Sequence, residues 1–221
     1  MTGELNIEQA RANMIEQQIR TWEVLDQHVL DTIAATPRED FVPESFRRLA
    51  FADTQIPIAH HEVMMAPKVE ARMIQSLRIR ESDTVLEIGT GSGYVTALLA
   101  RMASWVKSVE IHNDLSNGAR ERLQDTGIDN VTLEVGDALG SWISSAAYDA
   151  VVVTGSLPQY QSIFEHYVKL NGRLFVIVGA EPVMEALLLT RIREDSWSRE
   201  SLFETVLPPL VGAVKPPAFV F

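Results

Sequence analysis

A glycine-rich run directly after a short apolar segment restricts the fold of this chain more than any other feature. Residues 84–88 read Thr-Val-Leu-Glu-Ile, and Gly89, Gly91 and Gly93 follow before the helical pattern of residues 94–102. A strand, a glycine turn and a helix in this order are typical of nucleotide-binding α/β folds, because glycine allows sharp turns and close approach of a ligand. The spacing is G-x-G-x-G, whereas dinucleotide loops use G-x-G-x-x-G and seat a pyrophosphate on the helix N-terminus. The run therefore predicts S-adenosylmethionine, which has no phosphate, as the ligand.

Two acidic positions further along the chain support this prediction. Glu110 ends the expected strand 106–110, where an acid can accept hydrogen bonds from both ribose hydroxyls. Gly136-Asp137 follows the expected strand 130–135, and an Asp there can accept a hydrogen bond from the adenine amino group. Because ligands of α/β sheets bind at the carboxyl ends of the strands, we expect these residues to surround one cofactor site.

Strands and helices alternate after residue 83, whereas the preceding part is helical or irregular. Further strands are expected at 148–154, 174–178, 186–192 and 202–207, and helices at 115–124 and 162–168. Helices are also expected at 7–22, 27–35, 44–50 and 69–77, the last opened by Pro67 near its first turn. The pattern predicts an α/β fold with a doubly wound, Rossmann-like sheet, parallel except at its end, with 148–154 central. The expected organisation is an N-terminal helical cap segment at 1–80 and a methyltransferase core at 81–221.

Composition excludes several classes of protein. The chain has 19 Lys and Arg against 30 Asp and Glu, a net charge of −11, and no Cys. An acidic chain is a poor binder of nucleic-acid phosphates, so no nucleic-acid partner is expected. No apolar run approaches the roughly 20 residues of a membrane span, and the N-terminus lacks a signal pattern. A cytoplasmic protein without disulfides or a Cys-ligated metal is expected, and its oligomeric state stays open.

Segments along nearly the whole chain are similar to one methyltransferase family. They are Met-Ile-Glu-Gln-Gln-Ile (14–19), Pro-Arg-Glu-Asp-Phe-Val-Pro (37–43), Ala-Phe-Ala-Asp (50–53), Pro-Ile (57–58), Val-Leu-Glu-Ile-Gly-Thr-Gly-Ser-Gly-Tyr (85–94), Ser-Val-Glu (108–110), Gly-Asp (136–137), Tyr-Asp-Ala-Val-Val-Val-Thr (148–154) and Leu-Asn-Gly-Arg-Leu (170–174). On these residues the chain resembles the protein-L-isoaspartate (D-aspartate) O-methyltransferase family. Many methyltransferases share the glycine run, so the matches in the first third are the more specific ones.

The resemblance implies a Rossmann-like methyltransferase fold with N-terminal helices that roof the pocket. It implies methyl transfer from S-adenosylmethionine to the carboxylate of isoaspartyl residues, a protein-repair reaction. Together with the spacing, it assigns cofactor binding to Glu87, Gly89, Thr90, Gly91, Gly93, Glu110, Gly136 and Asp137.

One segment departs from the family pattern. After Pro-Ile the family typically runs Gly-His-Gly-Gln-Thr-Ile-Ser-Gln-Pro, whereas residues 59–67 here read Ala-His-His-Glu-Val-Met-Met-Ala-Pro. The family's Thr falls on Val63 and its active-site Ser on Met65, so both hydroxyls are missing. A carboxylate acceptor is ionised at neutral pH and needs no base, but it needs positioning and hydrogen bonds, each worth about 1.5–3 kcal/mol to a charged group. We therefore expect this site to give an isoaspartyl carboxylate too few hydrogen bonds and poor positioning. The catalytic residues stay unassigned.

The replacement residues suggest a base for a hydroxyl or amine acceptor instead. His60, His61 and Glu62 are the candidates, lined by adaptable Met64 and Met65. Alternatively, His60 simply retains the family's His while His61 faces solvent. No metal site is expected, because this spacing lacks a third partner.

Two hydroxyls after the expected strand 148–154 are further candidates for acceptor contacts. Thr154 and Ser156 are expected to hydrogen-bond an acceptor, with capping of the next helix as the alternative for Ser156.

Four functions stay open on the sequence. The first is a methyltransferase of the isoaspartyl family, and the second is a methyltransferase with another acceptor, a small molecule or a different protein group. The third is a catalytically silent S-adenosylmethionine-binding protein. A nicotinamide-dependent oxidoreductase is disfavoured by the glycine spacing. The apolar, Pro-rich tail at 207–221 is expected to dock, either over the pocket or on a partner.

Overall fold

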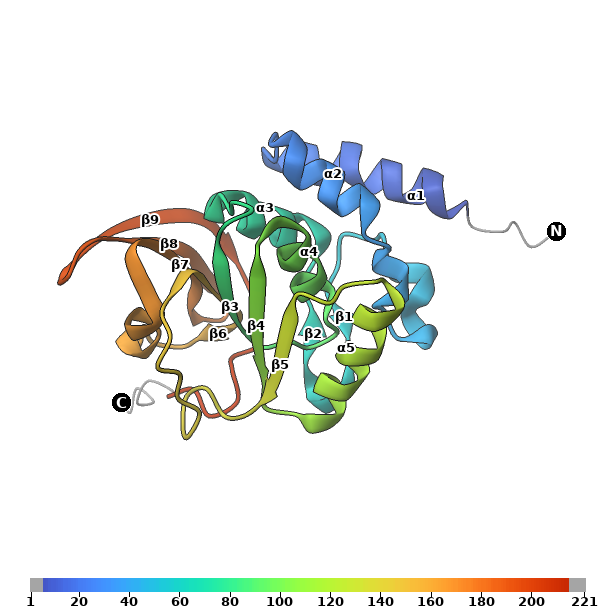
Figure 1. Ribbon diagram of the computed structural model, residues 1–221. Coiled ribbons are helices and arrows are strands. Elements are labelled where there is room, and N and C mark those ends of the chain that lie inside the picture. Colours follow the sequence, from blue (N-terminus) through green and yellow to red (C-terminus); the bar gives the residue numbers. More distant parts are fainter. Residues whose placement is uncertain (1–5, 215–221) are drawn as a thin grey trace, which may run out of the picture.

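A seven-stranded sheet forms the centre of the computed structural model, which describes residues 6–214 (Figure 1). The strand order is β5-β4-β3-β6-β7-β8-β9. The strands are β3 (Thr84–Ile88), β4 (Trp105–Glu110), β5 (Val131–Val135), β6 (Tyr148–Leu157), β7 (Val168–Ala180), β8 (Val183–Arg193) and β9 (Ser196–Thr205). Strands β3 to β7 pair in parallel, whereas β8 and β9 are antiparallel. The predicted fold class and the central position of β6 are confirmed.

Helices connect the first parallel strands. Helix α4 (Tyr94–Met102) joins β3 to β4, and α5 (Asn113–Asp125) joins β4 to β5. The helix predicted at 162–168 is a 3₁₀ helix, Ser162–Tyr167, and β7 begins directly after it. Residues 170–173, just before the strand expected at 174–178, already lie within β7, where Asn171 has a φ of 63°.

The N-terminal part is helical, as predicted, except for a small hairpin. Helix α1 (Ile7–Met14) continues as a π-helical turn, Ile15–Ile19, and a 3₁₀ turn, Arg20–Trp22. Helix α2 (Gln27–Ala35) is capped by the Asp26 carboxylate, and α3 (Pro67–Leu77) begins at proline. Shorter 3₁₀ helices span Arg38–Asp40, Glu44–Leu49 and Ala59–His61.

The expectation that this part contains no strand is wrong. Strand β1 (Ile56–Pro57) pairs antiparallel with β2 (Val63–Met64). Each strand has two residues, which is too short for an alternating pattern to reveal. The hairpin carries the segment in which the sequence departs from the family pattern.

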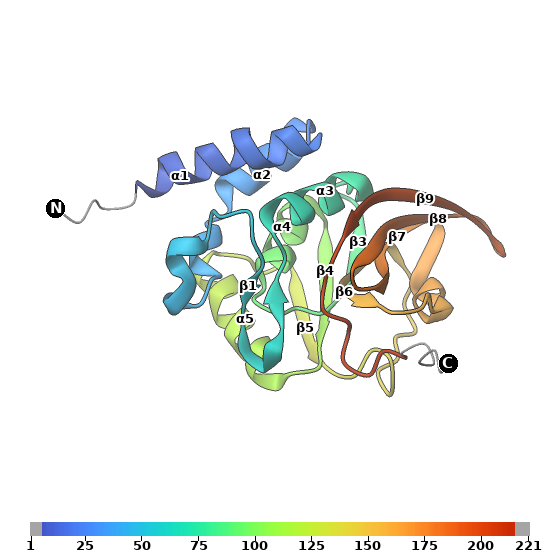
Figure 2. The same ribbon diagram turned by 180° about the vertical axis from the view of Figure 1, so that it is seen from behind.

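Two hydrophobic clusters cover the two faces of the sheet, because alternate residues of a strand face opposite sides. Val85 and Val152 belong to one cluster with residues of α1, α2, α3 and α4, whereas Leu86 and Val153 belong to the other. Figures 1 and 2 both show α1 and α2 lying above α3 and α4. The first cluster contains side chains that come before residue 80 in the chain and side chains that come after it. The division into segments 1–80 and 81–221 stays a prediction.

A buried arginine joins the N-terminal part to the core. The side chain of Arg38 is fully buried, and its Nε donates to the carbonyl of Ala50 at 2.8 Å. Its Nη2 donates to the carbonyl of Met65 at 2.8 Å, and its Nη1 pairs with the carboxylate of Glu70 on α3. The guanidinium also lies 4.7 Å from the ring centre of Tyr94 on α4. Arg38 thus ties four segments of the chain to one another.

Replacement of Arg38 by methionine is expected to lower the free energy of unfolding by about 3–5 kcal/mol, because it leaves the Glu70 carboxylate buried without its cation. Burial raises the pKa of Glu70 to about 7, so a neutral Glu70 favours the fold and this stability is lost as pH rises. Denaturant unfolding at pH 6 and pH 8.5 should show the larger loss at pH 8.5. The control is Arg47→Met, which removes an exposed pair with Asp40 and should cost less than about 1 kcal/mol. Equal losses in the two variants would contradict a special role for Arg38.

Candidate active site

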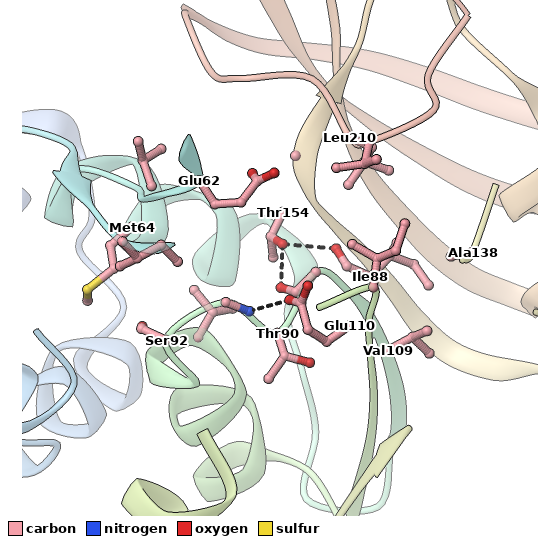
Figure 3. A pocket seen from close by; sticks show the side chains of 18 of the residues that line it. Glu62, Met64, Ile88, Thr90, Ser92, Val109, Glu110, Ala138, Thr154 and Leu210 are labelled. Carbon is pink, nitrogen blue, oxygen red and sulfur yellow. Dashed lines mark hydrogen bonds between the residues drawn. The ribbon is translucent and has the colours of Figure 1, made fainter. Parts of the chain in front are cut away.

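A cavity opens at the carboxyl ends of β3, β4 and β6 and encloses about 820 Å³ of empty space, open solvent at its mouth included. One wall consists of the glycine loop after β3, the end of β4 and the segment after β5. The other wall comes from the β1–β2 hairpin, the end of β6 and residues 210–211 (Figure 3). The predicted cofactor residues Gly89, Thr90, Gly91, Glu110, Gly136 and Asp137 all line this cavity.

The glycine loop has a backbone that other residues adopt only under strain. Gly89, Gly91 and Gly93 have φ angles of 96°, 53° and 86°. A Cβ at Gly89 would lie 2.4 Å from Oγ1 of Thr154, and one at Gly93 would lie 3.0 Å from Cβ of Ala119 on α5. The glycines therefore allow both the turn and the close packing of the loop against β6 and α5. Gly93 caps α4 and is not among the lining residues.

Glu110 and Asp137 present carboxylates to the cavity from neighbouring strand ends. Glu110 accepts hydrogen bonds from the backbone N–H of Gly91 at 2.8 Å and of His112 at 3.0 Å. Asp137 accepts one from the N–H of Leu139 at 3.0 Å. A carboxylate has about four acceptor positions, so both side chains keep capacity for a ligand. These bonds orient the two carboxylates before any ligand arrives.

Glu87 does not line the cavity, although the resemblance assigned it to the cofactor. Its side chain is fully buried behind the loop and accepts hydrogen bonds from the hydroxyls of Thr96 and Ser108. The Ser108 hydroxyl also lies 2.6 Å from that of Thr90, which does line the cavity. Burial raises the pKa of Glu87 to about 8, so the side chain is mostly neutral at pH 7. Glu87 therefore supports the glycine loop from behind.

Apolar side chains dominate the wall opposite the loop. Val63, Met64 and Met65 line the cavity where the family places a Thr and a Ser, and Met65 is only 4% exposed. Thr154, an expected acceptor contact, also lines it, but its hydroxyl lies 2.9 Å and 2.6 Å from the carbonyls of Ile88 and Gly89 and donates to this pair. The carboxyl group of Glu62 is a polar group on the same wall.

The two histidines of the hairpin are not among the residues that line the cavity, and the prediction of His60 as an acceptor-pocket residue stays a prediction. Nε2 of His60 is 2.8 Å from a carboxylate oxygen of Asp114, and its ring stacks on that of His112 at 4.0 Å. His61 is exposed. Both hairpin histidines have φ angles above 60°, as the turn between β1 and β2 requires. The sequence pattern gave no role to His112, because its neighbours in space come from a distant segment.

Ser156 also has a role that the sequence did not predict. Its hydroxyl is buried and donates to the carbonyl of Leu207 at 2.7 Å, so it neither contacts an acceptor nor caps a helix. Backbone hydrogen bonds from Ser156 to Pro208 and from Leu210 to Ser156 add to this anchor. The tail is thereby held so that Leu210 and Val211 line the cavity. Residues 215–221 of the predicted docking tail lie outside the described residues.

Replacement of Gly89 by alanine is expected to weaken binding of S-adenosylmethionine by at least tenfold, because the new Cβ overlaps the Thr154 hydroxyl and displaces the loop. Calorimetric titration measures the dissociation constant. Gly127→Ala is a matched control, since Gly127 has a φ of 70° but no atom within 4 Å of the new Cβ. If both variants bind like the unaltered chain, the loop does not hold the cofactor.

No helix among residues 6–214 is long and apolar enough to cross a membrane. In the same range no group of three His, Cys, Asp or Glu side chains is placed to hold a metal ion.

Comparison with known proteins identifies relatives over nearly the whole chain. Residues 9–215 match the family model described as protein-L-isoaspartate(D-aspartate) O-methyltransferase. A protein-L-isoaspartate O-methyltransferase of Rhodopseudomonas palustris is 38% identical over 90% of this chain and 92% of its own length. A second such enzyme, of Pelobacter propionicus, is 38% identical over 94% of this chain and 93% of its own.

Solved structures agree in fold. A Plasmodium falciparum crystal structure described as a β-aspartate methyltransferase, in complex with S-adenosyl-L-homocysteine, has a TM-score of 0.78 at 19% identity. The match covers 94% of this chain and 99% of that one. The family match also confirms the prediction of an S-adenosylmethionine-dependent methyltransferase. The chain thus belongs to the protein-L-isoaspartate (D-aspartate) O-methyltransferase family.

Proposed function

We propose that this protein transfers a methyl group from S-adenosylmethionine to the side-chain carboxylate of isoaspartyl residues in proteins. Family membership and the names of the relatives support this reaction. The observation that carries the proposal is the juxtaposition of the glycine loop, Glu110 and Asp137 around one cavity. In the proposed arrangement the acceptor lies against the opposite wall of that cavity.

The residues around the loop fit this cofactor. In the proposed arrangement Glu110 accepts hydrogen bonds from the ribose hydroxyls and Asp137 from the adenine amino group. A Cβ at Gly89 would lie 2.4 Å from the Thr154 hydroxyl, so glycine at this position lets the loop lie close against β6 at the edge of the cavity. When bound, the cofactor supplies an electrophilic methyl group on a sulfonium.

The acceptor side has two requirements, positioning and exclusion of water. A carboxylate is ionised at neutral pH, so no base has to remove a proton. Val63, Met64 and Met65 keep that wall apolar, and the anchored tail adds Leu210 and Val211. The two missing hydroxyls still predict weak binding of this acceptor, with a KM above that of family members that have them.

A methyltransferase with a hydroxyl or amine acceptor is the second candidate. The observation that favours it is the carboxyl group of Glu62 in the cavity wall, because a carboxylate can accept the proton of such an acceptor.

A cytoplasmic location and the absence of a nucleic-acid partner, expected from the sequence, stay predictions.

The test compares two synthetic peptides that differ only in one residue, isoaspartate or ordinary aspartate, at fixed S-adenosylmethionine. Formation of S-adenosylhomocysteine is measured, and we expect turnover with the isoaspartyl peptide alone. Calorimetry in parallel establishes that the cofactor binds. Cofactor binding without turnover on the isoaspartyl peptide would overturn the proposed acceptor, whereas binding of NAD in place of S-adenosylmethionine would overturn the cofactor.

A further inference from the structure

The cavity wall formed by the hairpin lacks the two hydroxyls of the family pattern, at Val63 and Met65. The residue directly before Val63, Glu62, contributes a carboxyl group to this wall. Glu62 directly precedes β2, which begins at Val63. Figure 3 shows the side chain of Glu62 extending from the hairpin into the cavity that it lines. The family pattern has a Gln at this place, whose amide can donate a hydrogen bond, whereas a Glu can donate only when it carries a proton.

The Glu62 carboxyl group has free bonding capacity. Among residues 6–214 no N–H or O–H group donates to it, and Nε2 of the His112 ring lies 3.9 Å away, beyond hydrogen-bond distance. The hydroxyls of Thr154 and Thr90 are both engaged within the protein. Glu70, which also lines the cavity, is paired with Arg38. Glu62 is therefore placed to bind a ligand directly.

We propose that Glu62, in its protonated form, donates a hydrogen bond to the carboxylate of the methyl acceptor and so replaces the hydroxyls missing at Val63 and Met65. This inference rests on the proposed isoaspartyl acceptor. It makes Glu62 a specificity-determining residue of the acceptor site. The chain then binds a carboxylate with a carboxylic acid, and the two groups share one proton because both cannot ionise at close range.

The surroundings of Glu62 favour the neutral acid. Burial and the neighbouring carboxylate of Glu110 raise the pKa of Glu62, while His112, His60 and His61 act in the opposite direction. The carboxylate of Asp114 is the acid bound to His60, at 2.8 Å from its Nε2. An acceptor carboxylate that enters the cavity adds a further negative charge and favours protonation of Glu62 again.

The transfer step needs no proton movement. Glu62 donates to one oxygen of the acceptor carboxylate and leaves the other oxygen free to attack. The C–O bond to the methyl carbon forms as the C–S bond of the sulfonium breaks, and the electron pair goes to sulfur. The products are a neutral ester and a neutral thioether, and Glu62 keeps its proton throughout.

The test follows kcat/KM for the isoaspartyl peptide between pH 6 and pH 9, with S-adenosylhomocysteine formation as the readout because ester hydrolysis does not affect it. In the unaltered chain kcat/KM should fall with rising pH, by up to about tenfold per pH unit above the pKa of Glu62. Glu62→Gln, which donates at every pH, should lose this dependence on pH. Glu185→Gln, on the exposed surface, and His112→Asn should keep the decline.

Each other outcome contradicts the inference in a recognisable way. A rate that rises with pH, together with loss of activity in Glu62→Gln, identifies Glu62 as a base for a proton-bearing acceptor. A decline that persists in Glu62→Gln but vanishes in His112→Asn assigns the titration to the histidine. Identical flat profiles in all variants remove any role for the protonation of Glu62. Absence of turnover at every pH, with cofactor bound, overturns the proposed function and the inference with it.

Discussion

The buried guanidinium of Arg38 is the contact on which the acceptor side of the site depends. It binds the carbonyl of Met65, the carboxylate of Glu70 and the carbonyl of Ala50, and it lies against the ring of Tyr94. A charge in this position is tolerated because each of its partners is fixed by a different element. The hairpin that carries residues 62–65 is therefore held against α3 and α4, and the cavity acquires its second wall.

On the cofactor side of the cavity, the backbone conformation of the glycine loop determines the shape of the site, whereas a buried side chain does so on the acceptor side. The loop needs positive φ angles and the absence of side chains, and the buried network of Glu87, Ser108 and Thr90 supports it from behind. Glu110 links the loop to β4 through the N–H of Gly91. The glycine-loop side and the hairpin meet across one cavity, so the acceptor wall can depart from the family pattern while the residues on the cofactor side keep it.

Local patterns in the sequence predicted most of the fold. The bounds of β3 and α4 agree with the structure to the residue, because an apolar run, a glycine turn and a helical period meet there without ambiguity. The β1–β2 hairpin was missed, since two-residue strands leave no periodic signal. Strand β6 runs three residues beyond its predicted end, because its extension is stabilised by the distant tail through Ser156.

The candidate site was predictable only where its residues are neighbours in the chain or follow strands. Glu110 and Asp137 were located by their places after strands, whereas the burial of Glu87 was not, because a strand-end acid can face either the cavity or the interior. The stacking of His60 on His112 and the entry of Leu210 into the cavity depend on contacts between distant segments. No local pattern encodes such contacts.

The most direct measurement of the acceptor arrangement is a crystal structure with S-adenosylhomocysteine and an isoaspartyl peptide. We expect the acceptor carboxylate to lie beside the sulfur with one oxygen about 2.5–2.7 Å from a carboxyl oxygen of Glu62, the short distance of an O–H group bonded to a carboxylate. An acceptor carboxylate held by other groups, with Glu62 turned toward His112, would contradict it.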